Sequence, residues 1–368
     1  MKLNATLIAL FLSMAILLPN CLLAQEKTKF AMVGLSHGHS PWFFEWGKQD
    51  DMELVGVYEP DAALANRFKE RYDLDASLIY SDLDKMLSES KPDGILVFGP
   101  IFYHLEAVEA AAPRGIHVMV EKPLATNPKD AKRMAALARE NNIHLLTNYE
   151  TSWYPSTEKT YRLFEEDKGD LGEIRKMVFH HGHQGPKEIG VGPEFLTWLT
   201  DPKLNGGGAL VDFGCYGANI MTYLKHGEKP LSVRAVTKNY KPEIYDKVDD
   251  EATIIVDFKD AQGIIQASWN WPFNRKDMEV YGQSGYVITK DNENMRWRFV
   301  GQKEEVSEVK AEELGLVSNP FIYFENVIKG KVELAPYSLY SLENNLMVVE
   351  ILEAAKQSAA TGRAVMLK

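Results

Sequence analysis

Three side chains in this sequence have the types and spacing for acid–base chemistry on a hydroxyl group. Lys122 follows an apolar segment typical of a strand, within the sequence Glu-Lys-Pro at 121–123. Asp212 and Tyr216 come after the glycines at 206–208, and their spacing places both on one face of a helix. A partly desolvated lysine can polarise an oxygen and lower the pKa of a neighbouring acid–base group. We expect Lys122, Asp212 and Tyr216 to be catalytic, with Tyr216 as the proton acceptor; a surface lysine and a surface Asp–Tyr pair are the structural alternatives.

A second group of residues has the placement of a dinucleotide-binding turn. The first expected strand runs into Gly34, but Ser36 and His39 stand where a fingerprint would have further glycines, so an ordinary strand-to-helix turn is the alternative. Glu59 follows the next expected strand, where a carboxylate accepts hydrogen bonds from the ribose hydroxyls and repels a 2′-phosphate. Glu59 therefore favours NAD over NADP. The expected contacts with the cofactor are Gly34, Ser36, His37, Gly38, His39 and Glu59.

Three histidines occur together on one expected strand. Strand alternation places His181 and His183 on one face and His180 on the other, so at most two of them could share a metal. No third ligand stands at a recognisable spacing, and we expect no metal site. Hydrogen bonding to a polyhydroxylated substrate suits these side chains, with a structural role as the alternative. The expected substrate contacts are Asn148, His181, His183 and Trp198.

Residues 28–148 have the pattern of a fold that would place the catalytic and cofactor-binding residues at one edge of a sheet. Short apolar runs alternate with amphipathic segments, which is typical of parallel βαβ units. The expected strands are 29–34, 54–58, 94–98, 117–120 and 144–146, and the expected helices are 41–48, 62–72, 82–88, 103–112 and 128–141. This is an α/β fold, a doubly wound parallel Rossmann sheet, which binds its ligand at the carboxyl ends of the strands.

Residues 149–368 have a different pattern, with strands that follow one another without a helix between each pair. The expected strands are 178–183, 232–239, 252–258, 263–269, 278–281 and 296–300, and the expected helices are 158–166, 209–224 and 339–360. This part is expected to be an α+β domain with a large, mostly antiparallel open sheet. Two domains agree with a length of 368 residues.

The first 24 residues have the pattern of a secretory signal peptide. Lys2 precedes an apolar run at 7–18 that is too short to span a bilayer, and Ala24 offers a small-residue cleavage site. The expected mature protein is exported, most simply to a periplasm, and has no membrane span; lipoprotein anchoring through Cys21 is a disfavoured alternative. The net charge of −11 provides no basic surface for nucleic acid.

Taken together, these motifs resemble those of the Gfo/Idh/MocA family of oxidoreductases. The resemblance covers nearly all of the chain after the signal, including Gly99-Pro100 followed by His104, the Glu-Lys-Pro sequence and the 206–216 segment. It implies a Rossmann domain, a second domain with an open sheet, a bound nicotinamide nucleotide, and hydride transfer at a hydroxyl-bearing carbon, usually of a sugar, inositol or glycoside. It also implies cofactor contacts by Gly99, Pro100, His104, Glu121 and Lys122.

The sequence departs from the family pattern at several positions. Tyr216 replaces the common His, as in glucose-fructose oxidoreductase, and Ile101 ends a loop that usually reads Thr-Pro-Asn. The resemblance also implies a homo-oligomer formed through the second sheet.

Free NAD is scarce outside the cytoplasm, so we expect an exported member to hold its cofactor tightly. Two alternatives to a dehydrogenase stay open: an NAD-recycling enzyme that cleaves glycosides by oxidation and elimination, and a non-catalytic sugar-binding protein on this fold.

Overall fold

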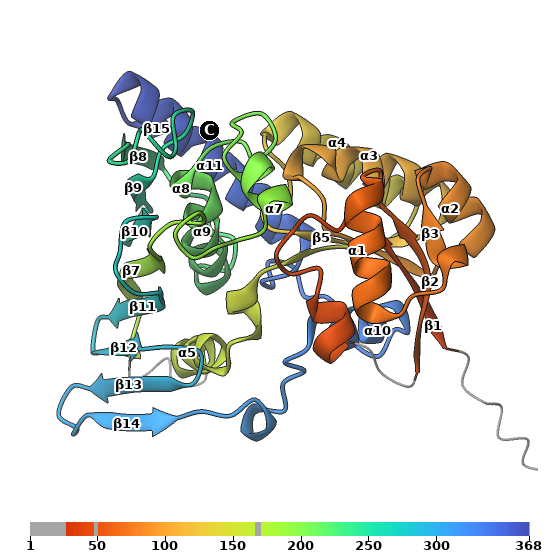
Figure 1. Ribbon diagram of the computed structural model, residues 1–368. Coiled ribbons are helices and arrows are strands. Elements are labelled where there is room, and N and C mark those ends of the chain that lie inside the picture. The colour runs from red at the N-terminus through yellow and green to blue at the C-terminus, as the bar shows by residue number, and fades with distance from the viewer. Residues whose placement is uncertain (1–26, 48–50, 166–170, 368) are drawn as a thin grey trace, which may run out of the picture.

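Two sheets form the framework of the chain in the computed structural model (Figure 1), which describes residues 27–47, 51–165 and 171–367. The first is a six-stranded sheet with the order β3-β2-β1-β4-β5-β6, and all of its pairs are parallel. The strand order reverses between β1 (Thr28–Val33) and β4 (Gly94–Val97). The crevice at such a reversal is where open α/β sheets bind ligands.

The other elements of the first domain confirm the doubly wound reading. The strands are β2 (Met52–Tyr58), β3 (Ile79–Tyr80), β5 (His117–Glu121) and β6 (Leu145–Asn148). The helices are α1 (Ala62–Tyr72), α2 (Leu83–Ser90), α3 (His104–Ala111) and α4 (Pro128–Glu140). Side-chain oxygens of Asp61, Asp82 and Asn127 cap the first turns of α1, α2 and α4, which fixes where these helices begin.

The second sheet has nine strands in the order β14-β13-β12-β11-β7-β10-β9-β8-β15, and only the β10–β7 pair is parallel. Its strands are β7 (Ile174–Gly182), β8 (Ser232–Lys238), β9 (Glu251–Asp257), β10 (Gln262–Ser268), β11 (Arg275–Gly282), β12 (Gly285–Thr289), β13 (Asn294–Phe299), β14 (Glu305–Glu308) and β15 (Val365–Met366). Buried residues alternate with partly exposed ones along most strands, so one face packs on a core.

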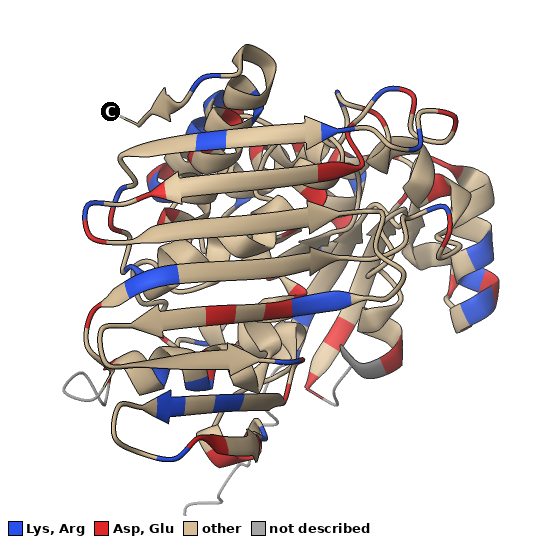
Figure 2. Ribbon diagram, turned by 90° about the vertical axis from the view of Figure 1, so that its left-hand side faces the viewer, with Lys and Arg blue, Asp and Glu red and all other residues tan. Residues whose placement is uncertain are grey.

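In the part of the chain that the structure describes, helices cover one face of this second sheet. They include α5 (Pro155–Glu165), α8 (Ala209–Asp212), α9 (Gly214–Leu224) and α11 (Leu342–Thr361). Figure 2 shows the opposite face open, with no helix lying across it. In the described part of the chain, no helix is long and apolar enough to cross a membrane.

The second half of the chain also completes the core of the first domain. Helix α10 (Pro320–Ile328) places Phe321 and Phe324 in the same buried cluster as Phe30 and Phe43. The Phe30 and Phe324 rings lie 5.6 Å apart between centroids. The two domains therefore share apolar packing that the sequence pattern did not reveal.

Several predicted elements differ from those of the structure. The expected helix at 41–48 is a short π-helix, η1 (Phe43–Gly47), within the described residues. The expected helix at 209–224 breaks at Phe213 into α8 and α9. Strands β3, β12, β14 and β15 and the helices α7 (Pro193–Leu199) and α10 were missed, because most are too short for a clear periodic pattern. The expected signal peptide at 1–24 lies outside the described residues.

Candidate active site

The structure brings the three expected catalytic side chains together. Lys122 follows β5, and its Nζ lies 2.5 Å from Oδ1 of Asp212, which ends α8. The other carboxylate oxygen of Asp212 accepts a hydrogen bond of 2.9 Å from Nε1 of Trp269. Tyr216 lies one turn further along α9, with its ring centroid 5.0 Å from Nζ of Lys122. All of these side chains are buried, so their charges and polar atoms interact in a medium of low dielectric.

The glycines before α8 let this helix approach the second sheet. A Cβ on Gly208 would lie 1.8 Å from the carbonyl oxygen of Asp249, so a side chain at this position is sterically excluded. The carboxylate of Asp249 accepts hydrogen bonds from the backbone N–H groups of Gly208 and Leu210. The glycine-rich sequence thus fixes where α8 begins, and thereby the position of Asp212.

The electrostatics of the pair differ from the sequence prediction in one respect. Burial opposes ionisation of both groups, but their mutual attraction outweighs it, so the pKa of Asp212 is lowered and that of Lys122 is raised. Burial raises the pKa of Tyr216 well above its usual value, and the nearby carboxylates, first of all Glu150, raise it further. The prediction of a lowered Tyr216 pKa is therefore wrong, because burial of the phenol and the neighbouring carboxylates raise this pKa.

A second ion pair lies beside the Tyr216 ring. Nζ of Lys276, on β11, is 5.2 Å from the Tyr216 ring centroid and pairs with Oε2 of Glu150. Burial opposes ionisation of Glu150, but Lys276 and further hydrogen bonds lower its pKa to about 2. Sequence reasoning missed this pair. Glu150 could have been suspected, because it closely follows β6 and so lies near the carboxyl edge of the first sheet. Lys276 lies on a strand whose sequence contains no catalytic motif.

His181 and His183 both lie beside the catalytic residues. The His181 ring packs edge-on against that of Tyr216 at 5.6 Å, and its Nδ1 is buried without a hydrogen-bond partner. His183 accepts a hydrogen bond at Nδ1 from the backbone N–H of Gly185, so in the neutral ring Nε2 carries the proton. Burial, above all, lowers the pKa of His181 to about 3 and that of His183 to about 4. Both rings are therefore neutral hydrogen-bonding groups near neutral pH.

A cavity of about 580 Å³ lies at the carboxyl ends of β1, β2 and β4. Among the expected cofactor contacts, Gly34, Ser36, Glu59, Gly99 and Pro100 line it. A Cβ built on Gly99 would meet no atom within 4 Å, and Gly34 has φ of +77° with the Gly99 backbone 2.8 Å from its Cβ position. Gly99 thus leaves open space in the cavity, and Gly34 permits close packing of the two turns. With this space beside the first turn and Glu59, the cavity fits a dinucleotide.

Glu59 is held at the wall of this cavity by the backbone. Its Oε2 accepts from the N–H of Leu35 at 2.8 Å and its Oε1 from the N–H of Asp61 at 2.9 Å. Burial raises its pKa, and these two hydrogen bonds oppose the shift. A carboxylate fixed in this way is preorganised to accept hydrogen bonds from the hydroxyl groups of a ribose.

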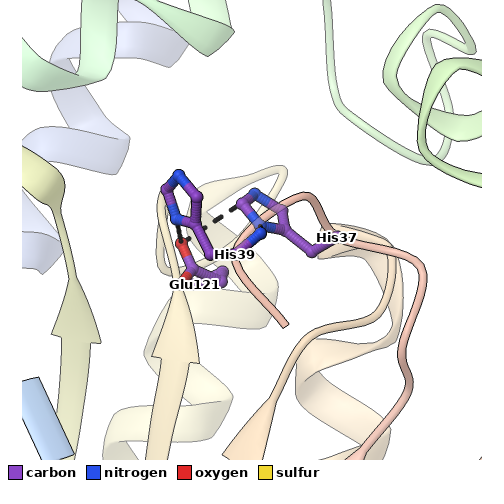
Figure 3. Close-up of side chains that lie close together, drawn as sticks. All are labelled: His37, His39 and Glu121. Atoms are coloured by element: carbon purple, nitrogen blue, oxygen red, sulfur yellow. Dashed lines mark hydrogen bonds and ion pairs between the residues drawn. The ribbon is translucent and has the colours of Figure 1, made fainter. Parts of the chain in front are cut away.

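The residues that follow Ser36 form a cluster with Glu121 (Figure 3). Nδ1 of His39 lies 3.1 Å, and Nε2 of His37 3.9 Å, from Oε2 of Glu121. These three side chains could hold a metal by their types and proximity, a grouping that sequence reasoning missed. However, the backbone N–H of His39 donates to Nδ1 of His37 at 3.0 Å, so the proton of a neutral His37 ring is on Nε2. This tautomer has no lone pair on the nitrogen nearest Glu121 and opposes metal binding there.

Two of the expected ligand-binding residues have supporting positions in the structure. Asn148 donates to Oε1 of Glu121 at 2.7 Å and accepts from Nε1 of Trp153, so it orients that carboxylate. His104 is fully buried, and its Nδ1 lies 3.1 Å from the carbonyl oxygen of Leu124. It packs beneath the turn that carries Lys122 and does not line the cavity.

Trp198, expected at the substrate, lines the cofactor cavity. Its Nε1 donates to Oγ of Ser36 at 3.0 Å, and it lines the cavity together with Glu194 and Thr197 from the same helix, α7. Glu194 also pairs with Arg67 of α1 at 3.0 Å. Helix α7 of the second domain thus contacts the first domain over the cavity, a long-range arrangement without a signal in the sequence.

Comparison with known protein families gives two matches along the chain. Residues 28–149 match the model described as the oxidoreductase family, NAD-binding Rossmann fold, of the Gfo/Idh/MocA group. Residues 166–288 match the Gfo/Idh/MocA C-terminal domain.

Individual relatives are distant. A D-xylose 1-dehydrogenase [NADP(+)] from Haloarcula marismortui is 23% identical over 79% of this chain and 79% of its own length. A D-glucoside 3-dehydrogenase from Escherichia coli is 30% identical over 48% of this chain and 47% of its own length. The crystal structure of aldose-aldose oxidoreductase from Caulobacter crescentus, complexed with glycerol, superposes with a TM-score of 0.77 at 23% identity, covering 93% of this chain and 100% of that chain.

Proposed function

Because the chain belongs to the Gfo/Idh/MocA family of oxidoreductases, we propose that it is an exported NAD-dependent enzyme acting on a sugar or glycoside hydroxyl. The observation that carries the proposal is the buried Lys122–Asp212 ion pair beside Tyr216. This constellation lies next to the His37–Glu121 cluster, which adjoins the cofactor cavity through Ser36.

The residues have distinct roles in the proposed reaction. Asp212 holds the ammonium of Lys122, which donates a hydrogen bond to the oxygen of the substrate hydroxyl. Tyr216 accepts the proton of that hydroxyl during oxidation and returns it during reduction. The nicotinamide ring, when bound, would exchange a hydride with the substrate carbon that bears this hydroxyl group. His181 and His183 hydrogen-bond further hydroxyls of the substrate.

The charge of the cavity supports NAD as the cofactor. Four carboxylates line it, those of Glu59, Asp61, Glu106 and Glu194, and none of its described lining residues is Lys or Arg. Glu194 is paired with Arg67, but the carboxylate of Glu59, held by backbone N–H groups at the cavity wall, would repel a 2′-phosphate. NADP is the alternative. Mass spectrometry of the nucleotide that copurifies with the protein separates the two.

Hydride transfer tests the function itself. Purified protein loaded with NAD is expected to oxidise one or more members of a panel of aldoses, polyols and glycosides, read as absorbance of the reduced nicotinamide. If no nucleotide copurifies and added NAD does not bind, the enzymatic proposal fails and the non-catalytic sugar-binding alternative stands.

A second candidate function is glycoside cleavage through transient oxidation. It is favoured by the Glu150–Lys276 pair, a second acid–base pair beside Tyr216 that a simple dehydrogenase does not need. Loss of a hydride and a proton converts the hydroxyl-bearing carbon into a ketone. Removal of an α-proton then eliminates the aglycone, which leaves with a proton, and water adds across the resulting double bond. Return of the hydride and of a proton restores the hydroxyl group. The net reaction is hydrolysis. Incubation with a glycoside without added NAD releases free sugar in this case, whereas a dehydrogenase accumulates a ketosugar.

Export and cofactor retention belong to the same proposal. We propose that residues 1–24 are removed on export to a periplasm and that helix α7, through Trp198 and Glu194, retains the nucleotide. Cell fractionation with N-terminal sequencing tests this, and the expected first residue is Gln25. An N-terminus lipidated at Cys21 would support membrane anchoring instead.

We also propose that the chain forms a homo-oligomer through the open face of the second sheet (Figure 2). Val178, Ile264 and Ile255 lie side by side across β7, β10 and β9 on this face. A row of β-branched side chains on an uncovered sheet is typical of an association surface.

A further inference from the structure

A second cavity, here called the outer cavity, lies close to the catalytic residues. It has a volume of about 390 Å³, within the range of roughly 300–1,000 Å³ typical of small-molecule sites. Its wall includes Trp42, Trp153, Tyr154, Glu150, Asn292 and Glu312. From the geometry of this cavity we propose that it binds a second saccharide unit, so that the substrate is a glycoside of at least two rings and not a free monosaccharide. The proposal rests on the function proposed above and specifies its substrate class.

The first argument is position. Glu150 belongs to the wall of the outer cavity and pairs directly with Lys276, whose Nζ lies 5.2 Å from the Tyr216 ring centroid. A single ion pair therefore separates the outer cavity from Tyr216. On the cofactor side, the ring of Trp42 stacks on His39 at 3.5 Å, and His39 contacts Glu121, which precedes Lys122. The outer cavity thus adjoins the catalytic residues from two directions.

The second argument is the chemistry of the wall. The indole ring of Trp42 and the phenol of Tyr154 provide aromatic surface, on which the C–H faces of a sugar ring pack well. Trp153 is buried and stacks on Tyr340, so it supports the wall. Glu150, Asn292 and Glu312 provide oxygens that accept hydrogen bonds from sugar hydroxyls. Aromatic rings interspersed with acceptors match an amphipathic polyhydroxylated ring better than they match a purely apolar aglycone.

The third argument is charge, which excludes other occupants. None of the described lining residues is Lys or Arg, so the cavity has no cation for a phosphate, a uronate or a nucleotide diphosphate. Two of the carboxylates are already paired, Glu150 with Lys276 and Glu293 with Lys310 at 2.7 Å. These pairs reduce the attraction for a cationic amino sugar. A neutral sugar ring remains as the occupant.

The test compares one reacting sugar with and without a second ring. With the NAD-loaded full chain, D-glucose is compared with maltose and cellobiose by steady-state kinetics and by saturation-transfer NMR. We expect at least one disaccharide to have a kcat/KM about tenfold or more above that of glucose, and protons of both of its rings to receive saturation. Equal kcat/KM values, or saturation of one ring only, would overturn the inference while leaving the proposed function intact.

Variants at exposed wall positions localise the effect. The double variant Asn292→Ala/Glu312→Ala removes two acceptors, and loss of one or two hydrogen bonds should reduce kcat/KM for the disaccharide about five- to fiftyfold. Its kcat/KM for glucose should not change. Glu313→Ala, in the same short 3-10 turn but outside the cavity wall, is the matched control. An equal loss on glucose and disaccharide would contradict a second subsite. Lack of hydride transfer to every carbohydrate would instead overturn the proposed function.

Discussion

Nζ of Lys122 lies 2.5 Å from Oδ1 of Asp212, and both side chains are nearly excluded from solvent. Neither residue is stable in this place as an isolated charge, because burial of an unpaired ion is strongly unfavourable. The pair is therefore a unit. Each residue keeps its charge because the other neutralises it. Single and double substitutions can therefore show how much the pair contributes to stability and how much to catalysis.

Asp212→Asn should leave the ammonium of Lys122 buried without its counter-charge. We expect a loss of about 3–5 kcal/mol in the free energy of unfolding and a lower pKa of Lys122, since the largest effect that opposes burial is then lost. The double variant Lys122→Met/Asp212→Leu removes both charges and should recover most of that stability, while hydride transfer falls at least about 10²-fold. Denaturant unfolding and steady-state kinetics measure the two effects. A double variant as unstable as Asp212→Asn would show that the pair is not the cause.

Tyr216 should make oxidation and reduction respond oppositely to pH. Burial raises its pKa, so near neutral pH the phenol is protonated and can donate a proton for reduction. Oxidation needs the deprotonated form, so its kcat/KM should rise with pH without levelling off up to about pH 9, while that of reduction should stay flat. Tyr216→Phe should lower both rates about 10²–10⁴-fold and abolish the pH dependence of oxidation. An unchanged profile in Tyr216→Phe would assign the proton transfer to another group.

The sequence alone predicted most elements of the first domain, for a physical reason. Strands β1, β4 and β5 are largely buried on both faces, so each contains a short apolar run, and capped amphipathic helices lie between the strands of this sheet. Element β3 has two residues and η1 a π-helical turn, and such short elements have no periodicity to detect. The catalytic Lys122, Asp212 and Tyr216 were recognisable because their neighbours in the chain form motifs.

The parts of the site that escaped prediction depend on contacts between distant segments. Lys276 reaches Tyr216 because β11 pairs with β7 in the register that sets Lys276 opposite His181. Trp198 was expected at the substrate, but its indole donates to Ser36 of the other domain. The pKa of Tyr216 was predicted in the wrong direction because the burial of its ring and the pairing of Lys122 with Asp212 are tertiary properties.

Glu59 should determine which nucleotide binds. Its carboxylate is fixed by the N–H groups of Leu35 and Asp61 and faces the cavity. We expect the wild-type protein to bind NAD at least about 10²-fold more tightly than NADP, since a 2′-phosphate would meet buried negative charge. Glu59→Ala should weaken NAD binding about tenfold and reduce this preference. Isothermal titration of apoprotein with each nucleotide gives both constants, with the exposed Glu53→Ala as control. Equal affinities in the wild type would contradict the role of Glu59.

Trp198 should control how long the nucleotide stays bound. Trp198→Phe keeps an aromatic ring over the cavity but removes the hydrogen bond to Ser36, so cofactor dissociation should accelerate about five- to tenfold. KM for the sugar should not change, because the indole lines the cofactor cavity and its hydrogen bond goes to Ser36. Stopped-flow displacement of bound NAD measures the rate, and Trp297→Phe, on β13, is the matched control. A raised sugar KM with unchanged cofactor dissociation would restore the substrate-binding role expected from the sequence.

Ile264 should be sensitive to a charge if the open sheet is an association surface. It is the middle residue of the row Val178, Ile264 and Ile255 on the uncovered face. Ile264→Glu would bury a carboxylate in an apolar interface without a counter-charge, so an oligomer should dissociate to monomers. Light scattering coupled to size-exclusion chromatography measures the mass, and circular dichroism checks that the variant is folded. Gln302→Glu, in the turn after β13, should leave the mass unchanged. A wild type that is monomeric at all concentrations would refute the association, whereas a folded Ile264→Glu oligomer would move the interface to another face.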